Sequence, residues 1–164
     1  MALQKGDKAP FFKLVSSDFK SANSDKKEVS LDDYKGKNLV VLFFPLAFSS
    51  VCTAELCSMR DDIGEYTALN AEVVAISVDS PYVLDRFKKD QSLTFLLLSD
   101  FNKEVSTAYG ALYENFAWGM KGVSKRSAFV IDGDGVIQYA EVLENAGDVP
   151  DFDAIKKVLD ELTR

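Results

Sequence analysis

Three short segments of the chain are apolar at almost every position, and they constrain the fold more than any other feature. They cover residues 38–44, 72–78 and 127–132. A strand that is apolar on both faces must be covered on both faces, as happens in the centre of a parallel or mixed sheet between helices. The longest apolar run, 39–48, is too short to span a bilayer and contains Pro45, so we expect no membrane segment.

Helical patterns fill the intervals between these strands. Apolar residues recur at spacings of three and four over 51–69 and again over 151–163, and Ser80 followed by proline predicts a helix start for 80–89. A fourth strand, 136–142, follows the third after a short Gly-Asp-Gly turn, which predicts an antiparallel hairpin. This order indicates an α/β chain with a central mixed sheet flanked by helices and preceded by an N-terminal extension.

The same order of elements is found in the thioredoxin-like fold, which we expect here by analogy. The length of 164 residues fits a single domain over 1–164. The polar stretch 16–27, rich in Ser, Lys, Asp and Asn, is interpreted as a loop, because too little sequence precedes it to form a separate domain.

The chain contains no histidine, and this absence excludes several kinds of chemistry. A Ser-His-Asp triad, a Cys-His pair and a histidine-ligated metal site are all impossible.

The net charge of −7 argues against a nucleic acid partner and against a basic membrane-binding patch. Two cysteines form no disulfide framework, and the N-terminus lacks a signal peptide core, so we expect a cytoplasmic protein.

The segment most able to carry chemistry joins the first apolar strand to the following helix and contains Pro45, Ser49 and Cys52. Ligands bind at the carboxyl ends of strands in open α/β sheets. Cys52 falls in the first turn of the predicted helix, where free N–H groups and the helix dipole stabilise a thiolate, the attacking form of the side chain. From the spacing alone, an inert and buried cysteine is about equally compatible with the sequence.

The pattern Pro45-x-x-x-Ser49-x-x-Cys52 resembles the active-site motif of the peroxiredoxins, Pro-x-x-x-Thr/Ser-x-x-Cys. The segments 6–12, 29–37 and 126–132 resemble, in the same order, the opening segment of that family, the segment before its central strand and the strand with its active-site arginine. The resemblance extends from residue 6 to the C-terminal helix. It implies a thioredoxin-like peroxidase that uses neither metal nor haem and needs no cofactor.

Carried over residue by residue, the resemblance assigns a role to each position of the motif. Cys52 would be the peroxidatic thiolate that becomes a sulfenic acid. Ser49 would hydrogen-bond the peroxide, Arg126 would hold both thiolate and peroxide, and Pro45 would exclude water. Glu55 would hold Arg126, although an acidic residue in the first turns of a helix also has an ordinary explanation in the helix dipole.

Cys57 has two possible roles. In an intact helix its Cα would lie roughly 8.6 Å from that of Cys52, whereas a disulfide needs about 7 Å or less. The resemblance to peroxiredoxin Q, or bacterioferritin-comigratory proteins, implies that the helix unwinds and that Cys57 resolves Cys52, after which a thioredoxin-like or other thiol reductant reopens the disulfide. The segment 43–48 is instead similar to E-type alkyl hydroperoxide reductases, some of which lack a resolving cysteine and would leave Cys57 structural. We favour the resolving role.

Two other classes of function compete with a peroxidase. A thiol–disulfide exchange protein is disfavoured because the two cysteines lack C-x-x-C spacing, and a redox sensor would oxidise once without turnover. The resemblance permits a monomer or a homodimer. We interpret the aromatic residues Tyr113, Phe116 and Trp118 as core packing, with a pocket rim or a subunit contact as the alternative.

Overall fold

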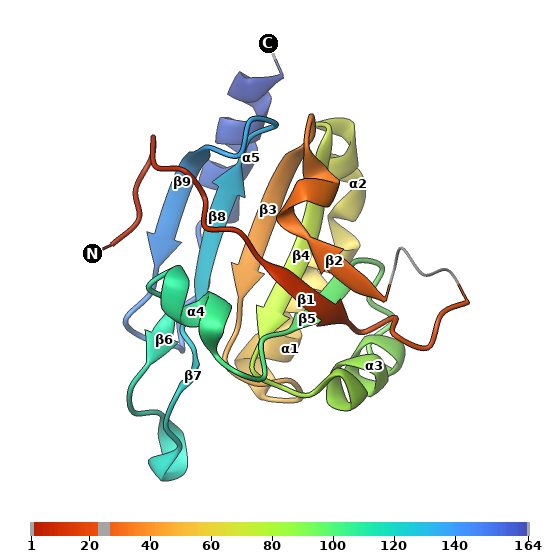
Figure 1. Ribbon diagram of the computed structural model, residues 1–164, viewed down its shortest axis with the longest axis vertical. Coiled ribbons are helices and arrows are strands. Elements are labelled where there is room, and N and C mark those ends of the chain that lie inside the picture. The colour runs from red at the N-terminus through yellow and green to blue at the C-terminus, as the bar shows by residue number, and fades with distance from the viewer. Residues whose placement is uncertain (1, 23–26, 164) are drawn as a thin grey trace.

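The computed structural model describes residues 2–22 and 27–163 and is built around a mixed sheet (Figure 1). In the described residues this sheet has seven strands in the order β2-β1-β5-β4-β3-β8-β9. Their bounds are β1 Lys13–Ser16, β2 Glu28–Ser30, β3 Asn38–Phe43, β4 Ala71–Ser77, β5 Leu96–Ser99, β8 Ser127–Ile131 and β9 Ile137–Val142. A separate pair is formed by β6 Leu112–Tyr113 and β7 Val123–Ser124.

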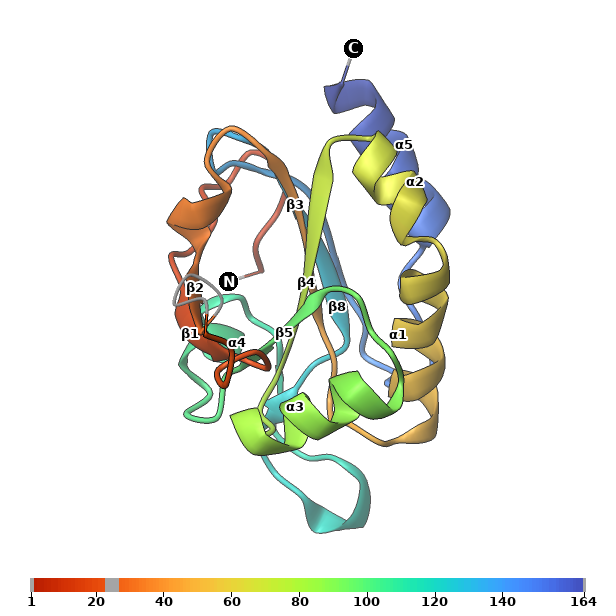
Figure 2. The ribbon, with the colours of Figure 1, turned by 90° about the vertical axis from the view of Figure 1, so that its right-hand side faces the viewer.

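Helices cover both faces of this sheet. Their bounds are α1 Ser50–Asp61, α2 Ile63–Ala68, α3 Pro81–Asp90, α4 Glu104–Ala108 and α5 Phe152–Leu162, with short 3-10 helices η2 Leu31–Tyr34 and η3 Ala117–Gly119. Figure 2 shows α1, α2 and α5 on one side of the central strands β3, β4 and β8, and α4 with the edge strands β1 and β2 on the other. The expected α/β class with a central mixed sheet is therefore confirmed.

The central strands are buried because side chains pack on both of their faces. All six residues of β3 are buried. Alternate residues of β3 point to opposite cores: Val40 and Leu42 join the core under α1, α3 and α5, whereas Val41 joins the core that contains Phe12 and Tyr109. This double coverage explains why the first apolar segment shows no alternation of polar and apolar residues.

The register of the sheet brings the ends of distant segments together. β3 runs parallel to β4, which runs parallel to β5, and β3 runs antiparallel to β8. The predicted hairpin of β8 and β9 is present, and its turn is closed by backbone N–H groups of Asp134 and Val136 that donate to the Asp132 carboxylate at 2.9 and 3.0 Å. Gly135 adopts a φ of 82°, which is favourable for glycine.

The long helix expected over 51–69 is wrong as a single element. The chain breaks at Asp62, whose φ of −98° and ψ of 6° separate α1 from α2. Aspartate is a weak helix former, and Gly64 follows in the first turn of α2. The other two predicted helices are present, with Ser80 and Asp151 accepting N-cap hydrogen bonds from the backbone at 3.3 and 3.0 Å.

The expected loop over 16–27 is only partly testable, because residues 23–26 lie outside the described residues. Ser16 ends β1, so the strand takes the first residue of the segment, whereas residues 17–22 form turns and bends, as expected for a loop. The backbone N–H of Ser17 donates to the Leu97 carbonyl at 2.7 Å, beside the edge where β1 pairs with β5. No helix in residues 2–22 and 27–163 is long and apolar enough to cross a membrane.

The aromatic cluster is corrected in part. Tyr113 is buried and stacks on Phe116 with ring centroids 5.7 Å apart, as core packing predicts. Trp118 is 95% exposed and sits at a φ of 62°, so the core interpretation of Trp118 is wrong. The tight turn of η3 points its side chain away from the protein.

Candidate active site

The candidate site lies where β3 ends and α1 begins. After Phe43 the chain passes through a loop to Ser49, which is the N-cap residue of α1, and Cys52 follows in the first turn. The side chain of Cys52 is fully buried and belongs to the core under α1. Pro45 is also buried, at the start of the loop. The positive end of the helix dipole is therefore close to the sulfur, in a place with no solvent.

Arg126 reaches this sulfur from the neighbouring strand. It immediately precedes β8, whose first residue, Ser127, pairs with Phe43 at the end of β3. Its Nη2 donates to the Cys52 Sγ at 3.1 Å, and its Nε donates to the Ala146 carbonyl at 2.9 Å. The antiparallel pairing of β3 and β8 thus juxtaposes residues that are 74 positions apart in the sequence.

A buried carboxylate completes the group. The Arg126 Nη1 donates to Glu55 Oε1 at 2.6 Å, and both side chains are almost fully buried. Glu55 follows Cys52 by one helical turn, so the two side chains lie on the same side of α1 and share one guanidinium. Among the buried side-chain oxygens and nitrogens of the described residues, only Glu55 Oε2 lacks a hydrogen-bond partner.

Burial and neighbouring charges shift the pKa values of Glu55 and Arg126. Burial raises the pKa of Glu55 to about 7, and the attraction and hydrogen bond of Arg126 offset only part of that rise. Burial alone would lower the pKa of Arg126, but the negative charges of Glu55 and Cys52 outweigh it and raise that pKa above its ordinary value. The guanidinium is therefore a permanent cation in contact with the sulfur.

The hydroxyl of Ser49 is oriented by the loop itself. It donates to the Leu46 carbonyl at 2.7 Å, while the Ser49 carbonyl accepts the Thr53 amide at 2.9 Å and the Thr53 hydroxyl at 2.8 Å. A hydroxyl that donates one hydrogen bond still has lone pairs that can accept another hydrogen bond. Ser49 is half-buried, so a small polar molecule can reach it.

Cys57 lies on a different side of the same intact helix. Its side chain is half-buried, and its Sγ donates to Gln91 Oε1 at 3.4 Å, at the C-terminal end of α3. The guanidinium of Arg60 also binds the Gln91 backbone carbonyl. Both cysteines are free thiols, and since α1 is continuous from Ser50 to Asp61, a disulfide between them requires a change of this helix.

The structure brings Arg126 into direct contact with both Cys52 and Glu55. Pro45 and Ser49 lie in the loop that precedes α1. Sequence reasoning missed Gln91, at Cys57, and Asp79, which accepts a hydrogen bond from the Ala47 amide in that loop. Neither residue carries a local signal, because each acts through a contact more than thirty positions away.

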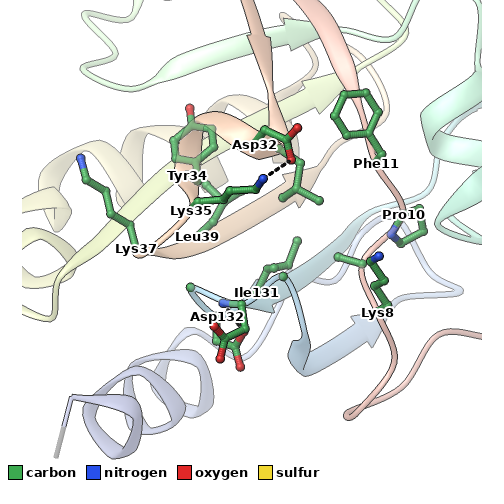
Figure 3. A pocket seen from close by; sticks show the side chains of 15 residues that line it. Lys8, Pro10, Phe11, Asp32, Tyr34, Lys35, Lys37, Leu39, Ile131 and Asp132 are labelled. Carbon is green, nitrogen blue, oxygen red and sulfur yellow. Dashed lines mark hydrogen bonds and ion pairs between the residues drawn. The ribbon is translucent and has the colours of Figure 1, made fainter.

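A cavity of about 730 Å³ lies apart from the thiol group (Figure 3). Its lining includes Leu39, at the start of β3, and Gly133, in the turn after β8, whereas Cys52 lies beyond the far end of β3. Three lysines and three aspartates line it, and Lys35 forms an ion pair with Asp32 at 3.7 Å. Such balanced charge selects neither anions nor cations.

The described residues contain no cluster of three or more metal-ligating side chains of the His, Cys, Asp or Glu type.

A mixed α/β sheet with a buried cysteine at a helix start, paired with a buried arginine, defines a thiol-based redox protein. Comparison with known proteins makes the class specific. Residues 5–140 match the AhpC/TSA family, so the chain belongs to this family. It is similar to a Mycobacterium tuberculosis protein that bears the name of a peroxiredoxin, with 43% identity over 141 residues and 85% of each chain covered.

Other relatives agree with this assignment. The mitochondrial thioredoxin-dependent peroxide reductase of Bos taurus is 40% identical over 144 residues, which cover 82% of this chain and 51% of that protein. Enterococcus faecalis AhpC superposes with a TM-score of 0.83 at 25% identity, covering 99% and 93% of the two chains. The reduced 2-Cys peroxiredoxin of Plasmodium vivax gives 0.82 at 28% identity, covering 98% and 82%. The chain is a peroxiredoxin-type, thiol-dependent peroxidase with a thioredoxin-like fold.

Proposed function

We propose that this chain reduces hydrogen peroxide and small organic hydroperoxides through the thiolate of Cys52. The observation that carries the proposal is the 3.1 Å contact between the buried Cys52 Sγ and the Arg126 guanidinium at the start of α1. A buried cation stabilises the thiolate, which is the nucleophile in this chemistry. The names of the relatives, which are peroxiredoxins and peroxide reductases, support the same substrate class.

The first step transfers one oxygen atom from the peroxide to sulfur. The Cys52 thiolate attacks the terminal oxygen, an S–O bond forms, the O–O bond breaks, and the other oxygen leaves as water or an alcohol after it takes up a proton. Negative charge moves from sulfur to the leaving oxygen, and the N–H groups of Arg126 are the donors that stabilise this shift. The lone pairs of Ser49 accept the O–H of the hydroperoxide, and the burial of Pro45 helps to exclude water.

Glu55 acts on this step through Arg126. Glu55 binds Nη1 of Arg126 at 2.6 Å, and the Ala146 carbonyl binds Nε of the same side chain. With these two nitrogens held, Nη2 of Arg126 is directed at the Cys52 sulfur. A guanidinium held at three of its nitrogens needs little rearrangement when charge moves during the reaction. Glu55 is thus a positioning residue and does not touch the peroxide.

The second step uses Cys57 as the resolving cysteine. Its thiolate attacks the sulfur of the Cys52 sulfenic acid, an S–S bond forms, and the hydroxyl leaves as water after protonation. The two residues are five positions apart in a continuous helix. The first turns of α1 must therefore unwind, which breaks the contacts of Cys52 with Arg126 and of Cys57 with Gln91.

A thioredoxin-like or other dithiol protein then reduces the disulfide and is itself oxidised to a disulfide. The name of the Bos taurus relative, a thioredoxin-dependent peroxide reductase, supports this class of reductant. Since the cycle needs a continuous supply of reduced thiols, we place it in a reducing compartment, the cytoplasm.

The experiment that tests the proposal is an intact mass measurement. The reduced chain receives one equivalent of hydrogen peroxide and is then quenched with a thiol alkylator under denaturing conditions. Loss of two hydrogens without alkylation supports a reactive Cys52 and a resolving Cys57. The matched Cys57→Ser variant should stop at one added oxygen.

Two other outcomes contradict parts of the proposal. One added oxygen in the unmodified chain, with Cys57 still alkylated, would mean that an external thiol resolves Cys52. The half-buried position of Cys57 and its bond to Gln91 make this one-cysteine peroxidase the second candidate function. Two alkylated thiols would mean that neither cysteine is activated, and the peroxidase proposal would be refuted.

A further inference from the structure

The loop that carries Ser49 is bound by a carboxylate that follows the next strand of the sheet. The Ala47 N–H donates to Asp79 Oδ2 at 2.7 Å, across 32 positions of sequence. Asp79 follows the end of β4, and β3 and β4 are parallel, with Phe43 paired to Ile76. Because parallel strands end at the same edge of the sheet, Asp79 is brought directly under the loop.

The anchored amide belongs to the same peptide group as the carbonyl that holds Ser49. The N–H of Ala47 and the C=O of Leu46 are the two polar groups of one planar unit, which point in opposite directions. The N–H binds Asp79, and the C=O accepts the Ser49 hydroxyl at 2.7 Å. Fixing one group therefore fixes the other, so the orientation of the Ser49 hydroxyl depends on Asp79.

Asp79 is itself held in place by the strand ends on which it rests. The Ser77 hydroxyl donates to the same Oδ2 at 2.7 Å, and the Asp79 N–H donates back to the Ser77 oxygen at 3.2 Å. The Ser99 hydroxyl, at the end of β5, donates to the Asp79 backbone carbonyl at 2.6 Å. The carboxylate is thus a fixed point, and the loop is the part that it orients.

The loop needs such an anchor because part of its backbone is strained. Phe48 has a φ of 69°, a left-handed conformation that is uncommon for a residue with a bulky side chain. Its ring packs against Phe87 of α3, with centroids 4.9 Å apart, yet it is 51% exposed. Contact with the Phe87 ring fixes the end of the loop at Phe48, and the hydrogen bond to Asp79 fixes the 46–47 peptide.

We propose that Asp79 is a positioning residue for peroxide reduction, which holds the 46–47 peptide so that Ser49 presents its lone pairs to the hydroperoxide O–H. This inference rests on the proposed reaction at Cys52. Asp79 does not contact the sulfur, and no contact joins it to Arg126, so it acts on the placement of the peroxide and leaves the formation of the thiolate unchanged.

The test is a double-mutant cycle in the Cys57→Ser background, in which only Cys52 reacts. The rate constant with hydrogen peroxide is measured for Asp79→Ala, Ser49→Ala and the double variant. We expect Asp79→Ala to lower this constant about ten-fold, the scale of one charge-assisted hydrogen bond. Because both changes act through the same hydroxyl, Asp79→Ala should have almost no further effect once Ser49 is alanine.

Two matched controls separate positioning from a general structural effect. Ser80→Ala removes the N-cap hydrogen bond of α3 next to Asp79 in the chain but keeps the bond of Asp79 to Ala47, and should leave the peroxide rate within about two-fold. Asp79→Asn keeps an acceptor oxygen for the Ala47 N–H and should recover most of the activity. The rate of alkylation of Cys52 by iodoacetamide should be the same in all variants, since it requires the thiolate but no bound peroxide.

Several results would overturn the inference. Additive losses in the cycle would show that Asp79 does not act through Ser49, and so would an unchanged rate in either single alanine variant. If Asp79→Ala does not fold, Asp79→Asn decides: a peroxide rate as low as that of Ser49→Ala would refute anchoring through an acceptor oxygen. Failure of the proposed function is distinct, because the unsubstituted chain would then show no reaction of Cys52 with peroxide.

Discussion

Replacing Glu55 by glutamine should change how the stability of the fold depends on pH. The carboxyl is buried, and its pKa is raised from 4.5 to about 7 because burial outweighs the attraction of Arg126. In the unfolded chain the pKa returns to its ordinary value, so between pH 4.5 and 7 the folded state binds the proton more tightly. The stability from this group is complete below pH 4.5 and is lost as the pH rises toward 7.

The size of this loss follows from the shift. At 1.36 kcal/mol per pKa unit, the change from 4.5 to about 7 corresponds to a loss of about 3 kcal/mol once Glu55 is ionised. About 2 to 3 kcal/mol of it falls between pH 5 and pH 8. Glutamine has nearly the same shape and does not titrate. The unfolding free energy of Glu55→Gln minus that of the unsubstituted chain should therefore be about 2 to 3 kcal/mol larger at pH 8 than at pH 5.

Urea unfolding of the two reduced proteins at pH 5 and pH 8 measures this difference. Contributions of most other groups cancel between the proteins. The same comparison in the Cys52→Ser background removes every contribution of that thiol. If the two proteins differ by the same free energy at both pH values, Glu55 is ionised throughout this range and the argument from its burial is wrong.

Three further predictions concern Arg126, Gln91 and Trp118. Arg126→Lys keeps a charge but cannot bind Glu55 and Cys52 together through a planar fork, so the peroxide rate of Cys52, measured by stopped flow, should fall by about 100-fold; an unchanged rate would contradict the role of the guanidinium. Gln91→Ala removes the partner of the Cys57 thiol, so closure of the disulfide, followed by mass after rapid quenching, should become about two- to five-fold faster; slower closure would mean that Gln91 assists the reaction. Trp118 is 95% exposed, so Trp118→Ala should change the unfolding free energy by less than about 0.5 kcal/mol, and a larger loss in urea unfolding would show that the side chain packs against something.

The sequence predicted those elements whose signal is local. Continuous apolar runs predicted β3, β4 and β8, because a strand buried on both faces has no other pattern. The N-cap Ser80 predicted the start of α3, and the spacing of apolar residues predicted α5. The strands β1, β2 and β5 were missed. They have only three or four residues each and exist because they pair with a neighbour, as Val15 does with Ser99.

The residues of the candidate site also differ in how far the sequence could predict them. The residues of the loop and of α1, among them Cys52, lie within one short stretch, so that stretch could be recognised in the sequence as a unit. Its contact with Arg126 could be expected only by resemblance to a family, because the antiparallel register of β3 and β8 creates it.

The sequence by itself determined the class of fold and the thiol chemistry that a chain without histidine can perform. Only the tertiary structure decided that Asp79 holds the loop, that Gln91 binds Cys57, and that Glu55 is buried deeply enough for its pKa to rise. The physical reason is distance along the chain. Hydrophobic periodicity and capping act over a few residues, whereas these hydrogen bonds and the burial that shifts a pKa depend on segments that meet only when the sheet has formed.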